Sequence, residues 1–108
     1  MSKNYRISII GTGNVAWHLS THLEYAGHTI EEVYGRNLNA AKNICSRLYY
    51  AKPVSSLDLT KSKARVFFIM VKDDAIEDVA AHLMLPDNAI LAHTSGTKPL
   101  SLLTHAHS

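Results

Sequence analysis

Two glycines that follow directly after an apolar segment constrain this chain more than any other feature of its sequence. Residues 7–10 are Ile-Ser-Ile-Ile, Gly11 and Gly13 come next, and the apolar residues of 14–26 recur at helical spacing. Because glycine accepts backbone conformations that other residues rarely adopt, a strand can turn sharply into a helix here. The pattern therefore predicts a strand, a tight turn and a helix in immediate succession.

Strand-like and helix-like segments continue to alternate along the chain. Pro53 excludes a continuous helix, so the segment around it is predicted to be a loop, in which Ser55 or Ser56 could cap a short helical turn. Asn37 is expected to cap the second helix. The predicted strands are 5–10, 29–34, 65–71 and 89–92, and the predicted helices are 14–26, 37–49, a segment from Asp73 or Asp74 onward, and 98–106. This alternation predicts an α/β fold of three layers, α/β/α, with a mainly parallel, doubly wound sheet.

Composition and charge argue against several classes of protein. The 108 residues carry a formal net charge of +2 and no basic run longer than two residues, so nucleic-acid binding is not expected. The longest strongly apolar run, 66–71, is too short to cross a membrane, and residues 1–10 lack the apolar segment of a signal peptide. Cys45, the single cysteine, is predicted to be a packed core thiol, and a cytoplasmic location fits.

The spacing of Gly11, Gly13 and Ala16 matches a dinucleotide-binding fingerprint in which alanine replaces the last glycine. The context also matches, because a strand precedes the motif and a helix begins inside it. Gly11 would permit the tight turn, and Gly13 would let the backbone approach a pyrophosphate. Ala16 would lie where helix and strand pack closely, and N–H groups at the helix start would face the phosphates. A glycine-rich turn that binds no ligand is the alternative.

The end of the second predicted strand indicates which dinucleotide would bind. NAD sites usually place Asp or Glu at this point, on the ribose hydroxyls. Glu31 and Glu32 come too early, inside the strand, and are interpreted as solvated or edge residues. Arg36 stands near the expected place and could pair with a 2′-phosphate while lying over the adenine. NADP(H) is therefore predicted over NAD(H), with an ordinary exposed cation as the alternative role for Arg36.

Two further segments follow the third and fourth predicted strands. Lys72 could contact cofactor or substrate, whereas Asp73 or Asp74 is expected to cap the next helix. His93 could act as a general acid or base. Ser95 and the backbone amide after it could hold a substrate oxyanion or carboxylate. A structural histidine at a strand end and a simple Ser-Gly turn are the alternative.

No metal site is predicted. His18 and His22 are spaced to share one face of the first helix, but no third ligand is evident, so both are interpreted as surface residues. Trp17 lies off the apolar stripe of that helix and is a candidate interface residue.

Four motifs of this chain together resemble those of a known family. They are ISIIGTGNVAWHL, VYGRN, VFFIMVKDDAIEDVA and ILAHTSGTKPL, and they extend from Arg6 to about Leu103. Together they resemble the N-terminal half of a family of NADP-dependent oxidoreductases. That family has a Rossmann-like domain followed by a helical domain of unknown function. It is related more distantly to pyrroline-5-carboxylate reductase and the β-hydroxyacid dehydrogenases.

The resemblance implies how this chain would bind its cofactor. The pyrophosphate would lie at residues 11–15 and the 2′-phosphate near residues 36–37, while residues 93–96 would face the reactive ring. Lys72 departs from the relatives, which often have a proline there. The implied cofactor-binding residues are Gly11, Thr12, Gly13, Asn14, Val15, Arg36, Asn37, Val71, Lys72 and Asp74. The candidate catalytic residues are His93, for proton transfer, and Ser95, for substrate anchoring.

The resemblance also implies that the chain is a truncated part of a longer protein. Residues 1–97 would form the NADP-binding Rossmann-like domain. Residues 98–108 would begin a connecting helix towards a helical domain, which in relatives builds the homodimer and closes the substrate site. The implied reaction is hydride transfer on a small substrate with a C=O or C=N group. The 108 residues alone are expected to bind NADP(H) weakly without turnover. A non-catalytic nucleotide-sensing domain and a nucleotide-free interaction module are the alternatives.

Overall fold

Strands and helices alternate along the described part of the chain, as the sequence pattern predicts. The computed structural model describes residues 4–71 and 73–93. The elements are β1 (Arg6–Ile10), α1 (Asn14–Tyr25), β2 (Thr29–Tyr34), α2 (Leu38–Cys45), β3 (Lys52–Val54), β4 (Val66–Ile69), α3 (Asp73–His82) and β5 (Ile90–His93). The bounds of β2 coincide with the prediction, and those of β1 and α1 differ from it by one residue at one end.

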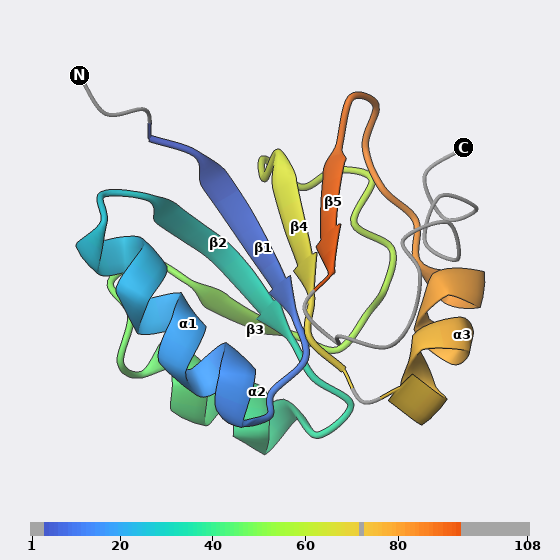
Figure 1. Ribbon diagram of the computed structural model, residues 1–108, viewed down its shortest axis with the longest axis horizontal. Coiled ribbons are helices and arrows are strands. Elements are labelled where there is room, and N and C mark those ends of the chain that lie inside the picture. Colours follow the sequence, from blue (N-terminus) through green and yellow to red (C-terminus); the bar gives the residue numbers. More distant parts are fainter. Residues whose placement is uncertain (1–3, 72, 94–108) are drawn as a thin grey trace.

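The strands form one parallel sheet in the order β3-β2-β1-β4-β5 (Figure 1). The chain first adds β2 and β3 on one side of β1, then crosses over to add β4 and β5 on the other side. Right-handed connections on the two sides of β1 place the helices on opposite faces of the sheet. The structure therefore confirms a Rossmann-like α/β fold, with a topological switch point between β1 and β4.

Two hydrophobic clusters, one on each face of the sheet, hold the helices against it. Ile9 faces α1 and α2 whereas Ile10 faces α3, because successive side chains of a strand point to opposite faces. The cluster under α1 and α2 contains Ile7, Ile9, Ala16, Ile30, Val33, Ala41, Ile44, Cys45 and Met70. The cluster under α3 contains Ile10, Leu59, Ala64, Phe67, Ile69, Ile76, Val79, Leu83 and Ala89. Each fully buried isoleucine or phenylalanine stabilises such a core by about 1.5–3 kcal/mol.

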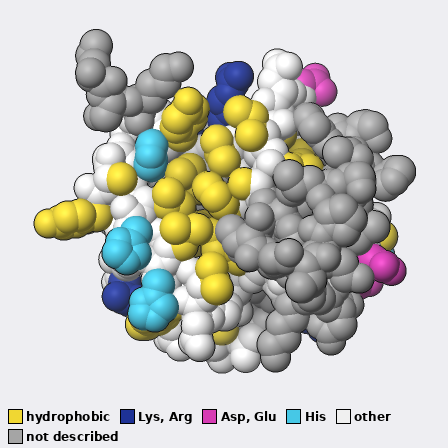
Figure 2. Space-filling model, viewed as in Figure 1, with side chains coloured by type: hydrophobic (Ala, Val, Ile, Leu, Met, Phe, Trp, Pro, Cys, Tyr) yellow, Lys and Arg dark blue, Asp and Glu magenta, His cyan; other side chains and the backbone are white. Residues whose placement is uncertain are grey.

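One side of β4 and β5 keeps apolar side chains partly exposed. Val66 and Phe68 of β4 are only half-buried, and Ile90, which pairs with Val66, keeps 45% of its surface exposed. Figure 2 shows apolar side chains gathered near the centre of one face of the molecule. The described helices therefore cover this part of the sheet incompletely.

The edge strand β3 corrects the prediction of a loop around Pro53. Proline excludes a helix, but it is tolerated in an edge strand because its missing N–H would have pointed away from the sheet. β3 lies at the edge of the sheet, next to β2. The predicted helical turn after it is also wrong. Residues 55–61 form bends, turns and an isolated bridge, and the Asp58 N–H donates a hydrogen bond to Ser56 Oγ at 3.1 Å.

The second helix starts where predicted but ends early. Asn37 caps it, since its Oδ1 accepts a hydrogen bond from the Asn39 N–H at 2.9 Å. The helix ends at Cys45, well before the predicted end at Tyr49. Beyond it the N–H of Leu48 bonds back to Cys45 over three residues, which tightens the chain into turns. Leu48 still packs against the core although it lies beyond the helix. The helical spacing of apolar residues therefore continues past the end of α2, which explains why the predicted helix is too long.

The last elements match their predicted positions in part. β4 occupies the centre of the predicted strand 65–71, and β5 is displaced by one residue from the predicted 89–92. α3 begins at Asp73, close to the start predicted from a cap at Asp73 or Asp74, and Asp73 is itself the first residue of the helix. The predicted helix 98–106 lies outside the described residues.

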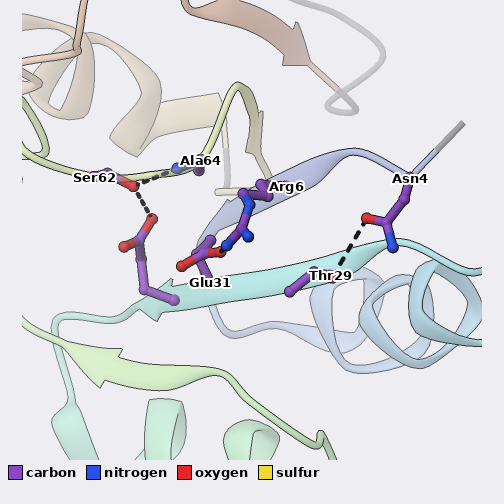
Figure 3. A network of polar contacts seen from close by, with 7 residues as sticks. Asn4, Arg6, Thr29, Glu31, Ser62 and Ala64 are labelled. Carbon is purple, nitrogen blue, oxygen red and sulfur yellow. Dashed lines mark hydrogen bonds and ion pairs between the residues drawn. The ribbon is translucent and has the colours of Figure 1, made fainter.

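The interpretation of Glu31 and Glu32 as solvated or edge residues is wrong for Glu31, which is buried, and Glu32 is half-buried in a strand that is not at the edge of the sheet. Glu31 is 7% exposed and forms an ion pair with Arg6 at 2.5 Å, whereas Glu32 accepts a hydrogen bond from Ser62 Oγ at 2.7 Å (Figure 3). The register between β1 and β2 shifts at this point, between the pairs that involve Ile30 and Glu32. Each carboxylate thus has a partner outside its own strand, Arg6 for Glu31 and Ser62 for Glu32, and neither stands at the end of β2.

Candidate functional site

The carboxyl ends of all five described strands meet in one row. The register aligns Val54 with Tyr34, Tyr34 with Ile10, Ile10 with Ile69, and Ile69 with His93. The segments that follow β1, β2 and β4 therefore start side by side at one edge of the sheet, where β5 also ends. Ligands of open parallel sheets bind at this edge, next to the switch point. Most residues singled out from the sequence belong to these segments.

Gly11 is required by the packing of the turn between β1 and α1. Its φ is +129°, and an added Cβ would lie 2.2 Å from the Met70 carbonyl oxygen. The turn is also tied on both sides, because the Gly11 N–H donates to the Tyr34 carbonyl and the Met70 N–H donates to the Ile10 carbonyl. Since backbone blocks the space, no other residue fits at Gly11. The turn is thus held rigidly between the ends of β2 and β4.

Gly13 occupies open space in the same turn. Its φ is −77°, which any residue can adopt, and nothing lies within 4 Å of an added Cβ. Packing within the described chain does not explain a glycine here. The open space above the backbone is what a closely approaching phosphate would need. The structure is therefore compatible with the role predicted for Gly13.

The first turn of α1 leaves its backbone donors available. Gly13 is the N-cap residue and offers no side chain to the helix, and the first turn contains no acidic residue. The first N–H groups of a helix have no partner within it and carry partial positive charge, so they attract anions. Asn14 and Val15 are exposed in this turn. This end of α1 can therefore accept a phosphate by backbone hydrogen bonds.

Ala16 is completely buried between α1 and the sheet. It belongs to the cluster that contains Ile9 and Met70. A methyl group fits at this contact, as expected when alanine replaces the last glycine of the fingerprint.

The turn after β2 lies against the glycine turn. An added Cβ on Gly35 would lie 2.6 Å from Thr12 Cγ2, so the two turns touch where both residues are small. Arg36 and Asn37 follow immediately. The Oδ1 atom of Asn37 is engaged in capping α2, whereas Arg36 is exposed. No carboxylate follows β2 before α2, because residues 35–37 are Gly, Arg and Asn.

The guanidinium of Arg36 has a partner that the sequence did not suggest. Its Nη2 lies 3.7 Å from Asp78 Oδ2, on α3. The same carboxylate lies 3.7 Å from His82 Nδ1, one turn further along α3. Because Arg36 and Asp78 are far apart in the sequence, no local pattern could reveal this pair. Arg36 is thus exposed, as in the alternative of an ordinary surface cation, and it is paired with Asp78.

The structure describes the other predicted site residues only in part. Val71 follows β4, and its Cγ1 would lie 3.4 Å from a Cβ on Gly11, so it borders the glycine turn. Asp74 lies in the first turn of α3 and His93 ends β5, but their side chains are outside the described structure. Lys72 and Ser95 lie entirely outside the described residues.

Away from the carboxyl ends of the strands, the described residues include neither a reactive thiol nor a metal site. Cys45 is buried, as predicted, and burial raises the pKa of its thiol to about 11, which keeps it protonated and unreactive near neutral pH. Within residues 4–71 and 73–93, no group of three or more His, Cys, Asp or Glu side chains could hold a metal. No helix in that part of the chain is long and apolar enough to cross a membrane.

Comparison with known families identifies the group to which this site belongs. The model of a family described as NADP oxidoreductase, coenzyme F420-dependent, matches residues 6–95. The chain belongs to this family. The match covers the glycine turn, the end of β2 and the ends of β4 and β5, so the resemblance noted in the sequence is confirmed. No curated protein sequence matches the chain.

Solved structures share the fold of this chain. A candidate NADP oxidoreductase of Bacteroides fragilis is 25% identical, with a TM-score of 0.77 over 89% of this chain and 38% of its own. A 1-pyrroline-5-carboxylate reductase of Streptococcus pyogenes is 24% identical, with a TM-score of 0.74 over 95% of this chain and 38% of its own. A 3-ketoreductase of Actinomadura kijaniata, in complex with NADP, is 16% identical, with a TM-score of 0.59 over 77% of this chain and 29% of its own.

The chain therefore spans 38% of the length of the first two of these proteins. What it shares with the family is the NAD(P)-dependent oxidoreductase Rossmann domain. Its own edge fits such a dinucleotide, because an uncapped helix end, an open glycine position and an arginine lie around one turn.

Proposed function

We propose that this chain is the NADP(H)-binding domain of an oxidoreductase. The observation that carries the proposal is the contrast between the two glycines of the β1–α1 turn. Gly11 is fixed by the Met70 backbone, whereas Gly13 is a glycine in open space at the uncapped end of α1. A rigid turn with an open backbone is suited to a pyrophosphate.

The cofactor preference rests on the turn after β2. Arg36 offers a guanidinium for a 2′-phosphate, and no carboxylate stands between β2 and α2 to bind a free ribose hydroxyl. Asn37 adds a side-chain amide next to it, although its oxygen caps α2. We therefore propose NADP(H) over NAD(H).

The proposed reaction is hydride transfer on a small molecule with a C=O or C=N group, and a bound nicotinamide would supply or accept the hydride. His93, at the end of β5, is proposed to transfer the proton, and Ser95 to anchor the substrate. Val71, Lys72 and Asp74 are proposed to border the cofactor. The complete protein is proposed to act as a homodimer and to bind neither nucleic acid nor membrane.

The test of cofactor choice is a calorimetric titration of NADPH and NADH into the chain and its Arg36→Ala variant. NADPH should bind more tightly than NADH, and Arg36→Ala should weaken NADPH about 10-fold to 100-fold, because a charge-assisted pair with phosphate is lost. NADH affinity should change less than twofold. Arg65→Ala is the matched control, because Arg65 is exposed and lies just before β4, at the amino ends of the strands.

Equal affinities for both nucleotides in the wild type and in Arg36→Ala would refute the NADP(H) preference. Absence of binding to either would favour a nucleotide-free interaction module. If the complete protein bound NADPH but oxidised it with no imine, ketone or semialdehyde, a nucleotide-sensing role would replace the enzymatic one.

A further inference from the structure

The ion pair between Arg36 and Asp78 joins two elements that lie on opposite faces of the sheet. Arg36 stands between β2 and α2, and α2 packs on the face that it shares with α1. Asp78 belongs to α3, which packs on the other face. A contact between them must pass over the carboxyl edge of the strands. The pair therefore spans the edge where ligands of parallel sheets bind.

The pair is weak enough for a phosphate to replace the Asp78 carboxylate at Arg36. Its N–O distance is 3.7 Å, and the two side chains are 73% and 63% exposed. Exposed pairs of this kind stabilise a protein only slightly, because water screens both charges. A phosphate carries more charge than a carboxylate and can engage the guanidinium fork with two parallel hydrogen bonds. A 2′-phosphate at Arg36 would therefore displace Asp78.

Among the described residues, the charged or titratable group near the Asp78 carboxylate, besides Arg36, is His82, on the same helix. His82 Nδ1 lies 3.7 Å from the second carboxylate oxygen and 2.9 Å from the Asp78 carbonyl oxygen. The imidazole thus lies close to both the backbone of α3 and the carboxylate, so Asp78 still has His82 as a neighbour after Arg36 leaves. The negative charge of Asp78 would then stand near the phosphate and repel it.

We infer that Asp78 is a specificity-determining residue, which holds Arg36 in the nucleotide-free protein and lowers the preference for NADP(H) over NAD(H). The inference rests on the proposed function. NADP(H) must break the Arg36–Asp78 pair to bind, whereas NAD(H), which has a hydroxyl in place of the phosphate, leaves the pair in place. Asp78 thus opposes only the nucleotide that takes Arg36.

The test is Asp78→Asn, which keeps the shape of the side chain and removes its charge. NADPH affinity should rise about twofold to fivefold at low salt, in keeping with an exposed pair. The NADH affinity should be unchanged, and the gain should shrink in about 1 M salt, where charges are screened within a few ångströms. Glu77→Gln is the matched control, because it removes an exposed carboxylate from the adjacent position of α3. Its effect on NADPH should be well below that of Asp78→Asn.

A second measurement, by NMR, detects the Arg36–Asp78 contact in the protein without nucleotide. The side-chain ¹⁵N resonances of Arg36 should shift in Asp78→Asn and stay in place in Glu77→Gln. Unchanged resonances in both variants would overturn the inference. So would a NADPH affinity that Asp78→Asn leaves equal or lowers. A loss of NADH affinity in Asp78→Asn would also overturn it, because Asp78 would then bind the ribose hydroxyl directly.

These outcomes separate the inference from the proposed function. NADPH binding that depends on Arg36 but is indifferent to Asp78→Asn removes the role of Asp78 and leaves the NADP(H) site standing. NADPH binding that is indifferent to Arg36→Ala, or no binding at all, removes both.

Discussion

Gly11 and Gly13 belong to one motif but are glycines for different reasons. At Gly11 the backbone has a positive φ and presses against the Met70 carbonyl, so the fold itself requires glycine. At Gly13 the backbone is ordinary and the space is open. Their spacing in the sequence treats the two residues alike, and only the contacts around them distinguish a folding requirement from a binding requirement.

Alanine substitution should separate these two requirements. In Gly11→Ala, a residue with a side chain must adopt a positive φ, and its Cβ clashes with the Met70 backbone. The free energy of unfolding should therefore fall by about 2–4 kcal/mol. Gly13→Ala should cost about 1 kcal/mol or less, because alanine is only a poorer N-cap than glycine there. Urea unfolding measures both changes. Gly13→Ala should still weaken NADPH binding at least tenfold; a variant that binds as well as the wild type would contradict the role of the open space.

The two helices on the same face of the sheet begin in different ways. α2 starts with Asn37, whose side chain satisfies the Asn39 N–H, whereas α1 starts at Gly13 without a side-chain cap. A capped helix end is stabilised by its own sequence, and an uncapped one leaves its donors for solvent or ligand. The difference favours α1 over α2 as the helix end that would bind the phosphates of the proposed cofactor.

Asn37→Ala should show that this residue serves α2 more than the ligand. Loss of the cap should lower the free energy of unfolding by about 1 kcal/mol, as measured by urea unfolding. Asn39→Ala, an exposed residue inside the helix, is the control and should change stability by less than about 0.5 kcal/mol. If Asn37→Ala also weakened NADPH but not NADH, the contact of Asn37 with the 2′-phosphate implied by the family resemblance would gain support.

At the scale of the whole molecule, the order of strands sets both the site and the pattern of stability. β1 lies in the middle of the sheet and pairs with β2 and β4, while β3 and β5 form the edges of the described sheet. The glycine turn follows this central strand. Because neighbours hold this turn on both sides, it would need little reorganisation to bind the proposed cofactor.

Amide hydrogen exchange should follow the same order. The N–H groups of β1 should be the slowest to exchange, those of β2 and β4 intermediate, and those of β3 and β5 the fastest, because edge strands open without disturbing the core. Exchange followed by mass spectrometry or NMR measures this order. Protection of β3 equal to that of β1 would contradict the sheet order.

Most of the architecture could be predicted from the sequence, since the alternating patterns located four of the five strands and the start of each described helix. The failures have physical causes. β3 escaped prediction because Pro53 is a poor strand residue everywhere except at an edge, and edge positions depend on the order of the strands. The burial of Glu31 was missed because Arg6, its partner, lies on the neighbouring strand.

In the candidate site, too, some features follow from local sequence and others only from tertiary contacts. Residue spacing alone placed the glycine turn, the cap of α2 and the arginine after β2, because each depends on backbone geometry within a few residues. The alignment of five strand ends, the open space at Gly13 and the partnership of Arg36 with Asp78 depend on segments far apart in the chain. Such contacts form only when the packed sheet brings these segments together, so no local pattern could contain them.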